Sequence, residues 1–183
     1  MSKHEIRICG VGGQGVITGG MIIGKAAAIF EDRNATLVQA FGPEARGSTV
    51  SAQVIVSDEP IPYPYLRGSN ILLAFGQSAY DKFVGEMAED SILVYEDELV
   101  VPDANLPKGA KTFGLPGTRL SEEEMGRRIV FNMVMSGFFA AVTGIIDVEA
   151  MRKAVADSVP KGTESFNLKA FNLGYENGLA KLG

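Results

Sequence analysis

The sequence has 183 residues, of which 46% are hydrophobic and 21% are charged, and its formal net charge is −5 at pH 7. A chain of this length and composition can bury one substantial core, so we expect residues 1–183 to form a single domain. The acidic balance and the lack of any lysine or arginine block argue against a nucleic-acid partner, because phosphate binding requires clustered cations.

Cys9 is the only cysteine in the chain and His4 is the only histidine. Disulfides, iron–sulfur clusters and His/Cys zinc sites within the chain are therefore excluded, and any redox cofactor is organic or belongs to a partner. The longest nearly apolar stretch, residues 129–142, is too short to span a bilayer, and no signal-peptide pattern is visible. We expect a cytoplasmic protein that does not contact a membrane.

Apolar patterning predicts strands and helices in alternation over the first part of the chain. Residues 5–9 are predicted to form a buried strand and residues 14–30 a helix, which together make a Rossmann-like first βα unit. Residues 35–40 and 48–57 are predicted to be the next two strands. The loop between them is too short for a parallel crossover, so we expect these two strands to pair antiparallel within a mixed sheet.

The rest of the chain predicts further strands, with helices gathered toward its end. Ser121 and Glu124 form a capping-box pattern that predicts one long helix from there to about Val142, and Asp147 is the predicted cap of the next helix. The other predicted segments are strands at 70–75 and 91–96, helices at 77–87 and 167–182, and short extended pieces at 98–101 and 110–113. These elements predict a single-domain, three-layer α/β/α fold with a mixed, largely parallel sheet.

Two glycine-rich loops each follow a predicted strand. Residues 10–15 read Gly-Val-Gly-Gly-Gln-Gly, and residues 41–47 read Phe-Gly-Pro-Glu-Ala-Arg-Gly. Both loops should open at the sheet edge where α/β proteins bind ligands. The first loop fits G-x-G-x-x-G, but Gln39 and Phe41 stand where a dinucleotide fold needs an acid. It is therefore either a dinucleotide site or a tight turn with close helix packing, and it lacks the lysine of a P-loop.

The second loop supplies an acid and a base, Glu44 and Arg46. The guanidinium of Arg46 presents a rigid fork of donors that suits a phosphate or a carboxylate. The alternatives are a contact between Glu44 and Arg46 within the loop or a plain surface charge. Residues 129–142 are apolar on nearly every side, which predicts a buried helix, and we expect this helix to contribute to a subunit contact as well.

Taken together, the two loops and the segment Val-Ile-Val-Ser-Asp-Glu-Pro-Ile at residues 54–61 resemble the gamma subunit of the 2-oxoacid:ferredoxin oxidoreductases. The resemblance covers essentially the whole chain and includes residues 132–135 and 167–175. The form Pro-Glu-Ala-Arg at residues 43–46 is more similar to the 2-oxoglutarate and branched-chain enzymes than to the pyruvate enzymes. The resemblance therefore favours 2-oxoglutarate as the substrate of the complex.

The resemblance implies a complex that oxidatively decarboxylates a 2-oxoacid to an acyl-CoA and reduces ferredoxin. It implies that thiamine diphosphate and iron–sulfur clusters lie on partner alpha and beta subunits, with an optional delta subunit. This chain would then hold no cofactor and no catalytic residue of its own, and a homodimer is a further option. Two alternatives stay open, namely a stand-alone nucleotide- or flavin-binding α/β protein and a purely structural, oligomer-forming subunit.

Coenzyme A is the co-substrate that the resemblance implies, and its phosphates suit backbone N–H groups at a helix N-terminus together with an arginine fork. The residues expected to bind it are Gly12, Gly13, Gln14, Gly15, Glu44 and Arg46. The alternative for this edge is that it only docks the catalytic subunits.

Overall fold

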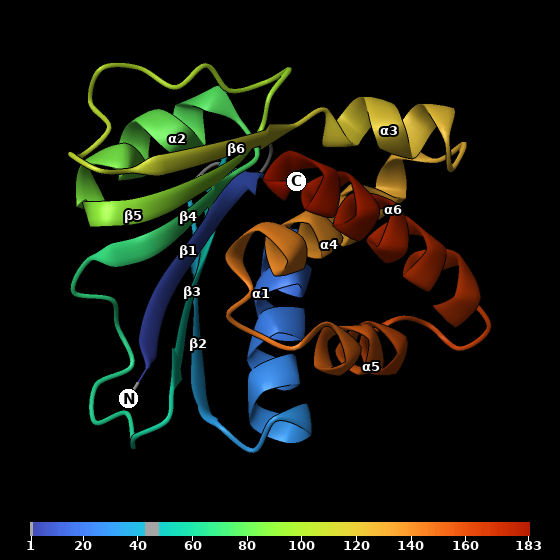
Figure 1. Ribbon diagram of the computed structural model, residues 1–183, viewed down its shortest axis with the longest axis horizontal. Helices are drawn as coiled ribbons and strands as arrows, with labels where there is room; N and C mark the ends of the chain where they lie inside the picture. Colours follow the sequence, from blue (N-terminus) through green and yellow to red (C-terminus); the bar gives the residue numbers. More distant parts are fainter. Residues whose placement is uncertain (1, 43–47) are drawn as a thin grey trace.

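The computed structural model describes residues 2–42 and 48–183 (Figure 1). Within these residues, six strands form one sheet in the order β2-β3-β1-β4-β5-β6. The strands are β1 (Lys3–Val11), β2 (Asn34–Phe41), β3 (Thr49–Ser57), β4 (Ser69–Ala74), β5 (Met87–Glu96) and β6 (Lys111–Leu115). The pairs β1–β4, β4–β5 and β5–β6 are parallel, whereas β3 runs antiparallel to both β1 and β2. The predicted mixed sheet and the antiparallel pairing of β2 with β3 are confirmed.

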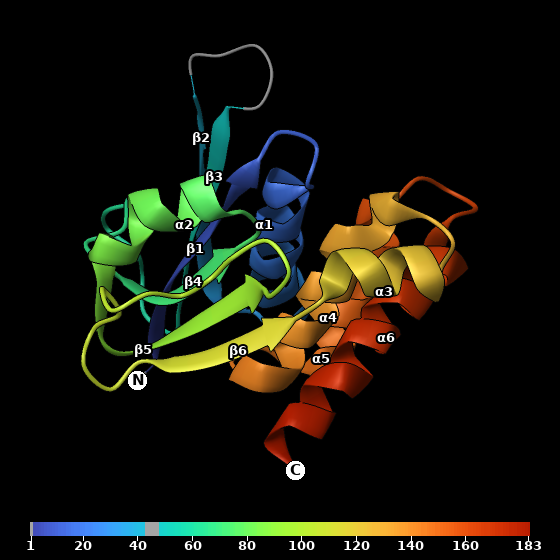
Figure 2. The same ribbon diagram turned by 90° about the horizontal axis from the view of Figure 1, so that it is seen from above.

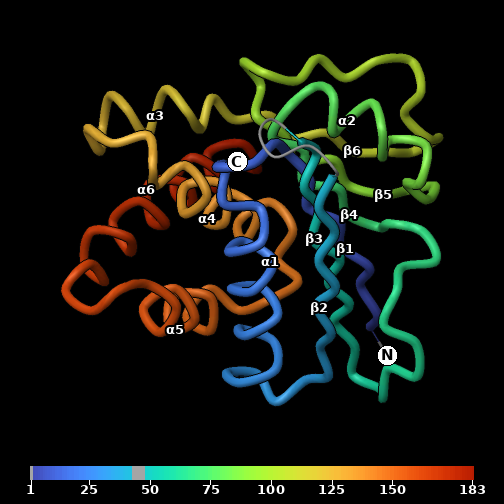
Figure 3. The backbone as a smooth tube through the Cα atoms, turned by 180° about the vertical axis from the view of Figure 1, so that it is seen from behind, coloured from blue at the N-terminus to red at the C-terminus, as the bar shows by residue number. Residues whose placement is uncertain are grey.

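Helices cover the two faces of the sheet unequally (Figures 2 and 3). One face carries α2 (Gln77–Phe83), which continues as the 3-10 turn η2 (Val84–Glu86). The other face carries α1 (Val16–Lys25) with the π-helical turn η1 (Ala26–Phe30), α3 (Gly117–Glu123), α4 (Phe131–Thr143), α5 (Val148–Ser158) and α6 (Glu164–Leu182). The sheet thus lies between two helical layers, as predicted.

Alternating side chains of the strands build a separate core on each face. In β4, Ile71 and Leu73 join the core beneath α1 and α4, whereas Leu72 and Ala74 join the core beneath α2. This alternation follows from the period of two in a β-strand. Cys9 of β1 lies in the core beneath α2 and is fully buried.

The helix α4 is enclosed by its own chain. Residues 131–142 are all buried, and α4 crosses α6 at Gly137 and Gly174. A Cβ atom on Gly174 would overlap the backbone of Val134, so the two helices touch through their backbones. The expectation that this helix also forms a subunit contact is therefore wrong for residues 131–142, because no face of it is left exposed. Ile129, just before α4, is 82% exposed.

The predicted start of the long helix at Ser121 is also wrong. Ser121 lies inside α3, and its hydroxyl donates to the carbonyl oxygen of Gly117 at 2.6 Å. The helical conformation ends before Gly126, whose φ is 67°. The chain then passes through the 3-10 turn η3 (Arg128–Val130) before α4 begins. Residues 98–101 form a turn and coil rather than an extended piece.

The predicted cap of α5 is confirmed. The carboxylate of Asp147 accepts hydrogen bonds from the backbone N–H groups of Glu149 (2.8 Å) and Ala150 (3.1 Å), as an N-cap acid does. In the described part of the chain, no helix is both long enough and apolar enough to cross a membrane.

Candidate functional site

The first glycine loop connects β1 to α1 in a conformation that requires glycine. Gly13 has a φ of 93° and Gly15 a φ of 72°, in the left-handed region that favours a residue without a Cβ atom. Gly15 also lies against α4, where a Cβ atom would come within 2.5 Å of the Asn132 amide nitrogen. The tight-turn and close-packing interpretation of this loop is therefore correct for Gly15. Sequence reasoning missed Asn132, which is buried and sets how close α4 comes to the loop.

Gln14 ties the loop to the neighbouring strand. Its side-chain oxygen accepts from the backbone N–H of Val11 (2.8 Å), and its side-chain nitrogen donates to the carbonyl oxygen of Phe75, the residue directly after β4 (2.8 Å). Its own backbone N–H donates to the carbonyl oxygen of Val11 (3.3 Å). Because these groups are engaged within the chain, Gln14 positions the loop.

A groove of about 520 Å³ runs between the glycine loop, the first turn of α1 and the end of the β2–β3 pair. Gly12 and Gly13 border it with open space above them, since a Cβ atom on either would meet no atom within 4 Å. The N-terminus of α1 has no side-chain cap and no acid in its first turn. Its first N–H groups therefore remain available as donors and carry a partial positive charge. This groove can accept an anionic group.

The second loop meets the same groove at its two ends. Gly42 and Ser48 both line the groove. The carbonyl oxygen of Ser48 accepts from the N–H of Gly12 (3.3 Å), and the N–H of Gly42 donates to the carbonyl oxygen of Thr49 (3.0 Å). Glu44 and Arg46, which were expected to act here, lie outside the described residues.

A second hollow of about 290 Å³ lies on the other side of the glycine loop, between Gly13 and the start of α4. It is lined by the exposed Arg128 and by Thr118 of α3. Sequence reasoning missed Arg128 because residues 121–142 were interpreted as one continuous helix. The sequence did contain a signal for a break in this helix, namely Gly126, because glycine often ends helices, followed directly by two arginines.

A buried carboxylate holds Thr118, one of the residues that line this second hollow, in place. Glu96, at the carboxyl end of β5, is fully buried and accepts from the backbone N–H (2.8 Å) and hydroxyl (3.2 Å) of Thr118. Burial raises the pKa of Glu96, and the N–H donors of Thr118 and Glu98 oppose that shift. Glu96 therefore fixes the start of α3 at the same sheet edge as the glycine loop.

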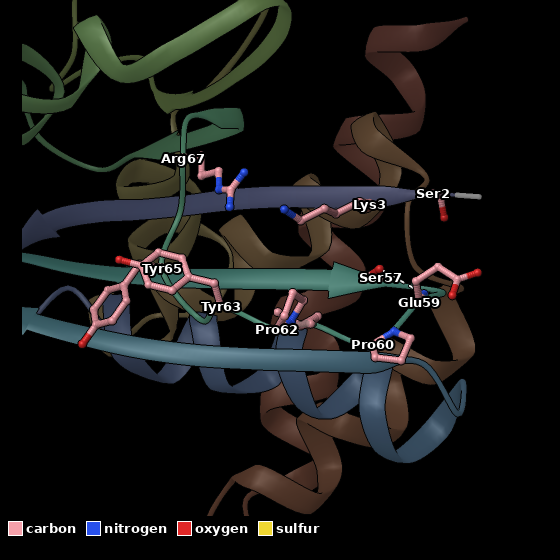
Figure 4. A pocket seen from close by; sticks show the side chains of 10 residues that line it. Ser2, Lys3, Ser57, Glu59, Pro60, Pro62, Tyr63, Tyr65 and Arg67 are labelled. Carbon is pink, nitrogen blue, oxygen red and sulfur yellow. Dashed lines mark hydrogen bonds between the residues drawn. The ribbon is translucent and has the colours of Figure 1, made fainter.

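A third hollow, of about 320 Å³, lies where β1 begins and β3 ends, at the opposite end of these strands from the glycine loop (Figure 4). The proline-rich segment 59–67 forms one wall, where the rings of Tyr63 and Tyr65 lie 5.3 Å apart. Lys3, which also lines it, is paired with Glu5 at 2.7 Å. Ligands of α/β sheets bind outside the carboxyl ends of the parallel strands, so the glycine groove is the better candidate site.

The sheet order bears on the dinucleotide interpretation of the glycine loop. A dinucleotide fold places the end of the second strand beside the end of the first, so that an acid there can bind ribose. Here β3 lies between β1 and β2, and Gln39 and Phe41 occupy the end of β2. The loop has the glycines of a dinucleotide site without its ribose-binding geometry.

Comparisons with known proteins agree on one family. Residues 5–177 match the family model described as pyruvate ferredoxin/flavodoxin oxidoreductase. The chain is 42% identical over 174 residues to the 2-oxoglutarate synthase subunit KorC of Methanocaldococcus jannaschii, covering 95% of this chain and 93% of that relative.

Solved structures show the same fold. The gamma subunit of the keto/oxoacid ferredoxin oxidoreductase from Geobacter sulfurreducens superposes with a TM-score of 0.84 and 36% identity over 97% of this chain and 99% of that one. The 2-oxoglutarate:ferredoxin oxidoreductase of Magnetococcus marinus, solved with 2-oxoglutarate, coenzyme A and succinyl-CoA, superposes with a TM-score of 0.87 at 24% identity. That match covers 98% of this chain and 32% of the longer one. The chain therefore belongs to the pyruvate ferredoxin/flavodoxin oxidoreductase family, and its relatives include gamma subunits of the oxoacid ferredoxin oxidoreductases.

Proposed function

We propose that this chain, as one domain over residues 1–183, is the gamma subunit of a complex that oxidatively decarboxylates 2-oxoglutarate to succinyl-CoA and reduces ferredoxin. The observation that carries the proposal is the end-to-end match to a 2-oxoglutarate synthase subunit of nearly the same length. The fold agrees, because the gamma subunit of a keto/oxoacid ferredoxin oxidoreductase superposes over almost the whole chain.

We infer that the cofactors of this reaction lie on partner subunits. The lone cysteine, Cys9, is buried in β1 and cannot ligate an iron–sulfur cluster. In the described residues, no group of three or more His, Cys, Asp or Glu side chains is arranged to hold a metal ion. Thiamine diphosphate and the clusters would then belong to the alpha, beta and optional delta subunits, with this chain not catalytic alone. A lone reduced cysteine also fits a cytoplasmic complex.

We further infer that the glycine groove holds the phosphates of coenzyme A as it approaches the catalytic subunits. The support is the uncapped N-terminus of α1 and the open space above Gly12 and Gly13, together with one arginine that the structure positions and one that is known from the sequence alone. Arg128 lines the adjoining hollow, and Arg46 stands in the loop between Gly42 and Ser48. Guanidinium groups and helix N-termini are the donors that phosphates favour.

Deletion of the gene and complementation test the proposed reaction. Extracts of the deletion strain should lose the reduction of ferredoxin that depends on 2-oxoglutarate and coenzyme A, and this chain should restore it. Pyruvate and 3-methyl-2-oxobutanoate are assayed separately, as alternative substrates, in the same extracts. An unchanged 2-oxoglutarate activity in the deletion strain, with loss of a different 2-oxoacid activity, would reassign the substrate.

Arginine variants of the assembled complex test the coenzyme A site. Loss of one charge-assisted phosphate contact costs roughly 1.5–3 kcal/mol, so Arg46→Ala and Arg128→Ala should each raise the KM for coenzyme A about ten- to a hundredfold. The matched control is Arg127→Ala, because the Arg127 guanidinium lies 5.8 Å from the centre of the Phe166 ring instead of lining the hollow. If both variants assemble normally and keep the wild-type KM for coenzyme A, the groove is not a coenzyme A site. If the variants fail to assemble, this edge of the sheet docks the catalytic subunits instead.

A further inference from the structure

The third hollow, where β1 begins and β3 ends, takes no part in the proposed enzymatic function. Its volume of about 320 Å³ lies within the range of small-molecule sites, which is about 300–1,000 Å³. Lys3 at the start of β1 lines this hollow, whereas Val11 at the end of the same strand lines the glycine groove. The length of the strand separates the two places by about 25 Å. A ligand in the third hollow would therefore occupy a site of its own.

Hydrogen bonds at both ends hold the proline-rich wall of this hollow, residues 59–67, against β3. At one end, the N–H of Glu59 donates to the hydroxyl of Ser57 (3.0 Å). At the other end, the N–H of Leu66 donates to the side-chain oxygen of Gln53 (3.0 Å). Three prolines lie between these anchors, and each fixes the φ angle of its residue. The wall is thus formed before any ligand arrives, as is usual for small-molecule sites.

Two tyrosine rings give this wall an apolar surface. The ring centres of Tyr63 and Tyr65 lie 5.3 Å apart, with their planes tilted by 49°. Both side chains line the hollow together with Ile61 and Pro62 (Figure 4), and they are 52% and 48% exposed. Aromatic rings favour offset or edge-on contacts with other rings. The two tyrosines can therefore receive a flat apolar group.

Two cations lie beside the tyrosine rings. Figure 4 shows the side chains of Lys3 and Arg67 pointing toward one another over β1. The ammonium of Lys3 is paired with the carboxylate of Glu5 at 2.7 Å. Arg67 is exposed, and within the part of the chain that the structure describes it forms no ion pair. Glu59 also lines the hollow, but its carboxylate points away from Arg67 (Figure 4). One positive charge beside the rings is thus left without a counter-charge.

These groups together define the chemistry of a ligand. A guanidinium binds a carboxylate through two parallel hydrogen bonds, and charge-assisted bonds of this kind are among the strongest that side chains form. A neutral ligand would leave Lys3 and Arg67 facing one another as like charges. A single surplus positive charge matches a monocarboxylate better than a phosphate dianion. The tyrosine rings match a flat body, and the volume of the hollow suits about one or two rings.

We propose that the third hollow binds a small aromatic monocarboxylate. The carboxylate pairs with the guanidinium of Arg67, and the ammonium of Lys3 lies close enough to add a second attraction. The ring system of the ligand packs on Tyr63 and Tyr65. Binding is reversible and involves no covalent step. The site is separate from the glycine groove, so this proposal stands apart from the proposed enzymatic function.

Titration of the purified full chain with 2-naphthoate tests the proposal, by calorimetry and by the chemical shifts of the backbone amides. We expect a dissociation constant of about 1 mM or below, with the largest shifts in residues 59–67. Arg67→Gln and Tyr65→Ala should each raise this constant about tenfold. Both side chains are exposed, so the fold should stay intact. The matched control is Arg119→Gln, because the exposed Arg119 pairs with Glu98 and does not line the hollow, and it should bind as the wild type does.

Two analogues separate the role of the charge from the role of the rings. The neutral 2-naphthamide should bind about tenfold more weakly than 2-naphthoate, and cyclohexanecarboxylate, which lacks a flat ring, should also bind more weakly.

Three results would overturn the proposal. The first is that 2-naphthoate fails to bind at about 5 mM, well above the expected dissociation constant. The second is that it binds equally well to Arg67→Gln, or shifts the amides of the glycine groove instead of residues 59–67. The third comes from repeating the titration on the assembled complex. If assembly abolishes the binding, a partner subunit covers the hollow and it is not a ligand site, whereas unchanged binding supports the proposal.

Discussion

Substitution of Gly174 by alanine tests how the chain holds α4 in place. Gly174 of α6 faces α4, and a Cβ atom there would lie far inside normal contact distance of the Val134 carbonyl. Alanine improves helix propensity by about 1 kcal/mol over glycine, whereas overpacking costs about 1–3 kcal/mol and sometimes more. The blocking atoms are backbone and cannot rotate away, so the steric cost should lie at or above the top of that range. We expect a net loss of about 2 kcal/mol or more in the free energy of unfolding.

Gly19 supplies the matched control. It is also a buried glycine within a helix, but a Cβ atom there would lie 3.9 Å from Ile8 and from Ser136, an ordinary contact distance. Gly19→Ala should therefore stabilise the chain by about 0.5–1 kcal/mol. Urea and thermal unfolding measure both variants, and Gly174→Ala should lower Tm by about 4–8 °C. If Gly174→Ala is as stable as the wild type, α4 and α6 are not held in backbone contact at Gly174.

Three further experiments test the contacts of Gln14, Glu96 and Cys9. Gln14→Glu should cost about 1–3 kcal/mol in urea unfolding, because a carboxylate cannot donate to the Phe75 carbonyl oxygen; an unchanged midpoint would show that the Gln14 contacts are unimportant. Burial raises the pKa of Glu96, so the folded chain binds its proton more tightly than the unfolded chain. The stabilisation by Glu96 should be complete at pH values below the pKa of a glutamate in the unfolded chain, and it should be lost as pH rises through the pKa of Glu96 in the folded chain. Glu96→Gln should remove this pH dependence of the free energy of unfolding. Burial raises the pKa of Cys9 to about 12, so a thiol reagent should label it only after unfolding, and rapid labelling of the native chain would contradict its buried position.

Local patterns predicted those parts of the fold that local geometry determines. The antiparallel pairing of β2 and β3 followed from the length of their connecting loop, and the cap of α5 followed from the side chain of Asp147. The start of α3 did not follow, because the acceptor for its first-turn N–H group is the carboxylate of Glu96, which lies 22 residues earlier in the chain. The capping-box pattern at Ser121 considers only residues three positions apart, so it could not indicate a partner so far away in the sequence.

The same limit applies to the site and to the core. The glycines at positions 12, 13 and 15 indicated a functional edge, but only the tertiary structure brings Asn132 against Gly15 and Arg128 beside Gly13. Arg7 is a charged residue buried in the middle of β1, and it pairs with Glu86, 79 residues away, at 2.5 Å. Periodicity within β1 gives no sign of that partner. Contacts between residues far apart in sequence therefore account for most of what the sequence did not predict.

The proposed function makes this chain the gamma subunit of a thiamine-dependent 2-oxoacid oxidoreductase. The most direct measurement is to tag the chain at its native expression level, purify it under mild conditions, and analyse the bound proteins and cofactors. We expect the chain to be recovered with catalytic subunits that bring stoichiometric thiamine diphosphate and iron, and the preparation to reduce ferredoxin with 2-oxoglutarate and coenzyme A. Recovery of the chain free of those subunits, or with a bound nucleotide or flavin of its own, would contradict it.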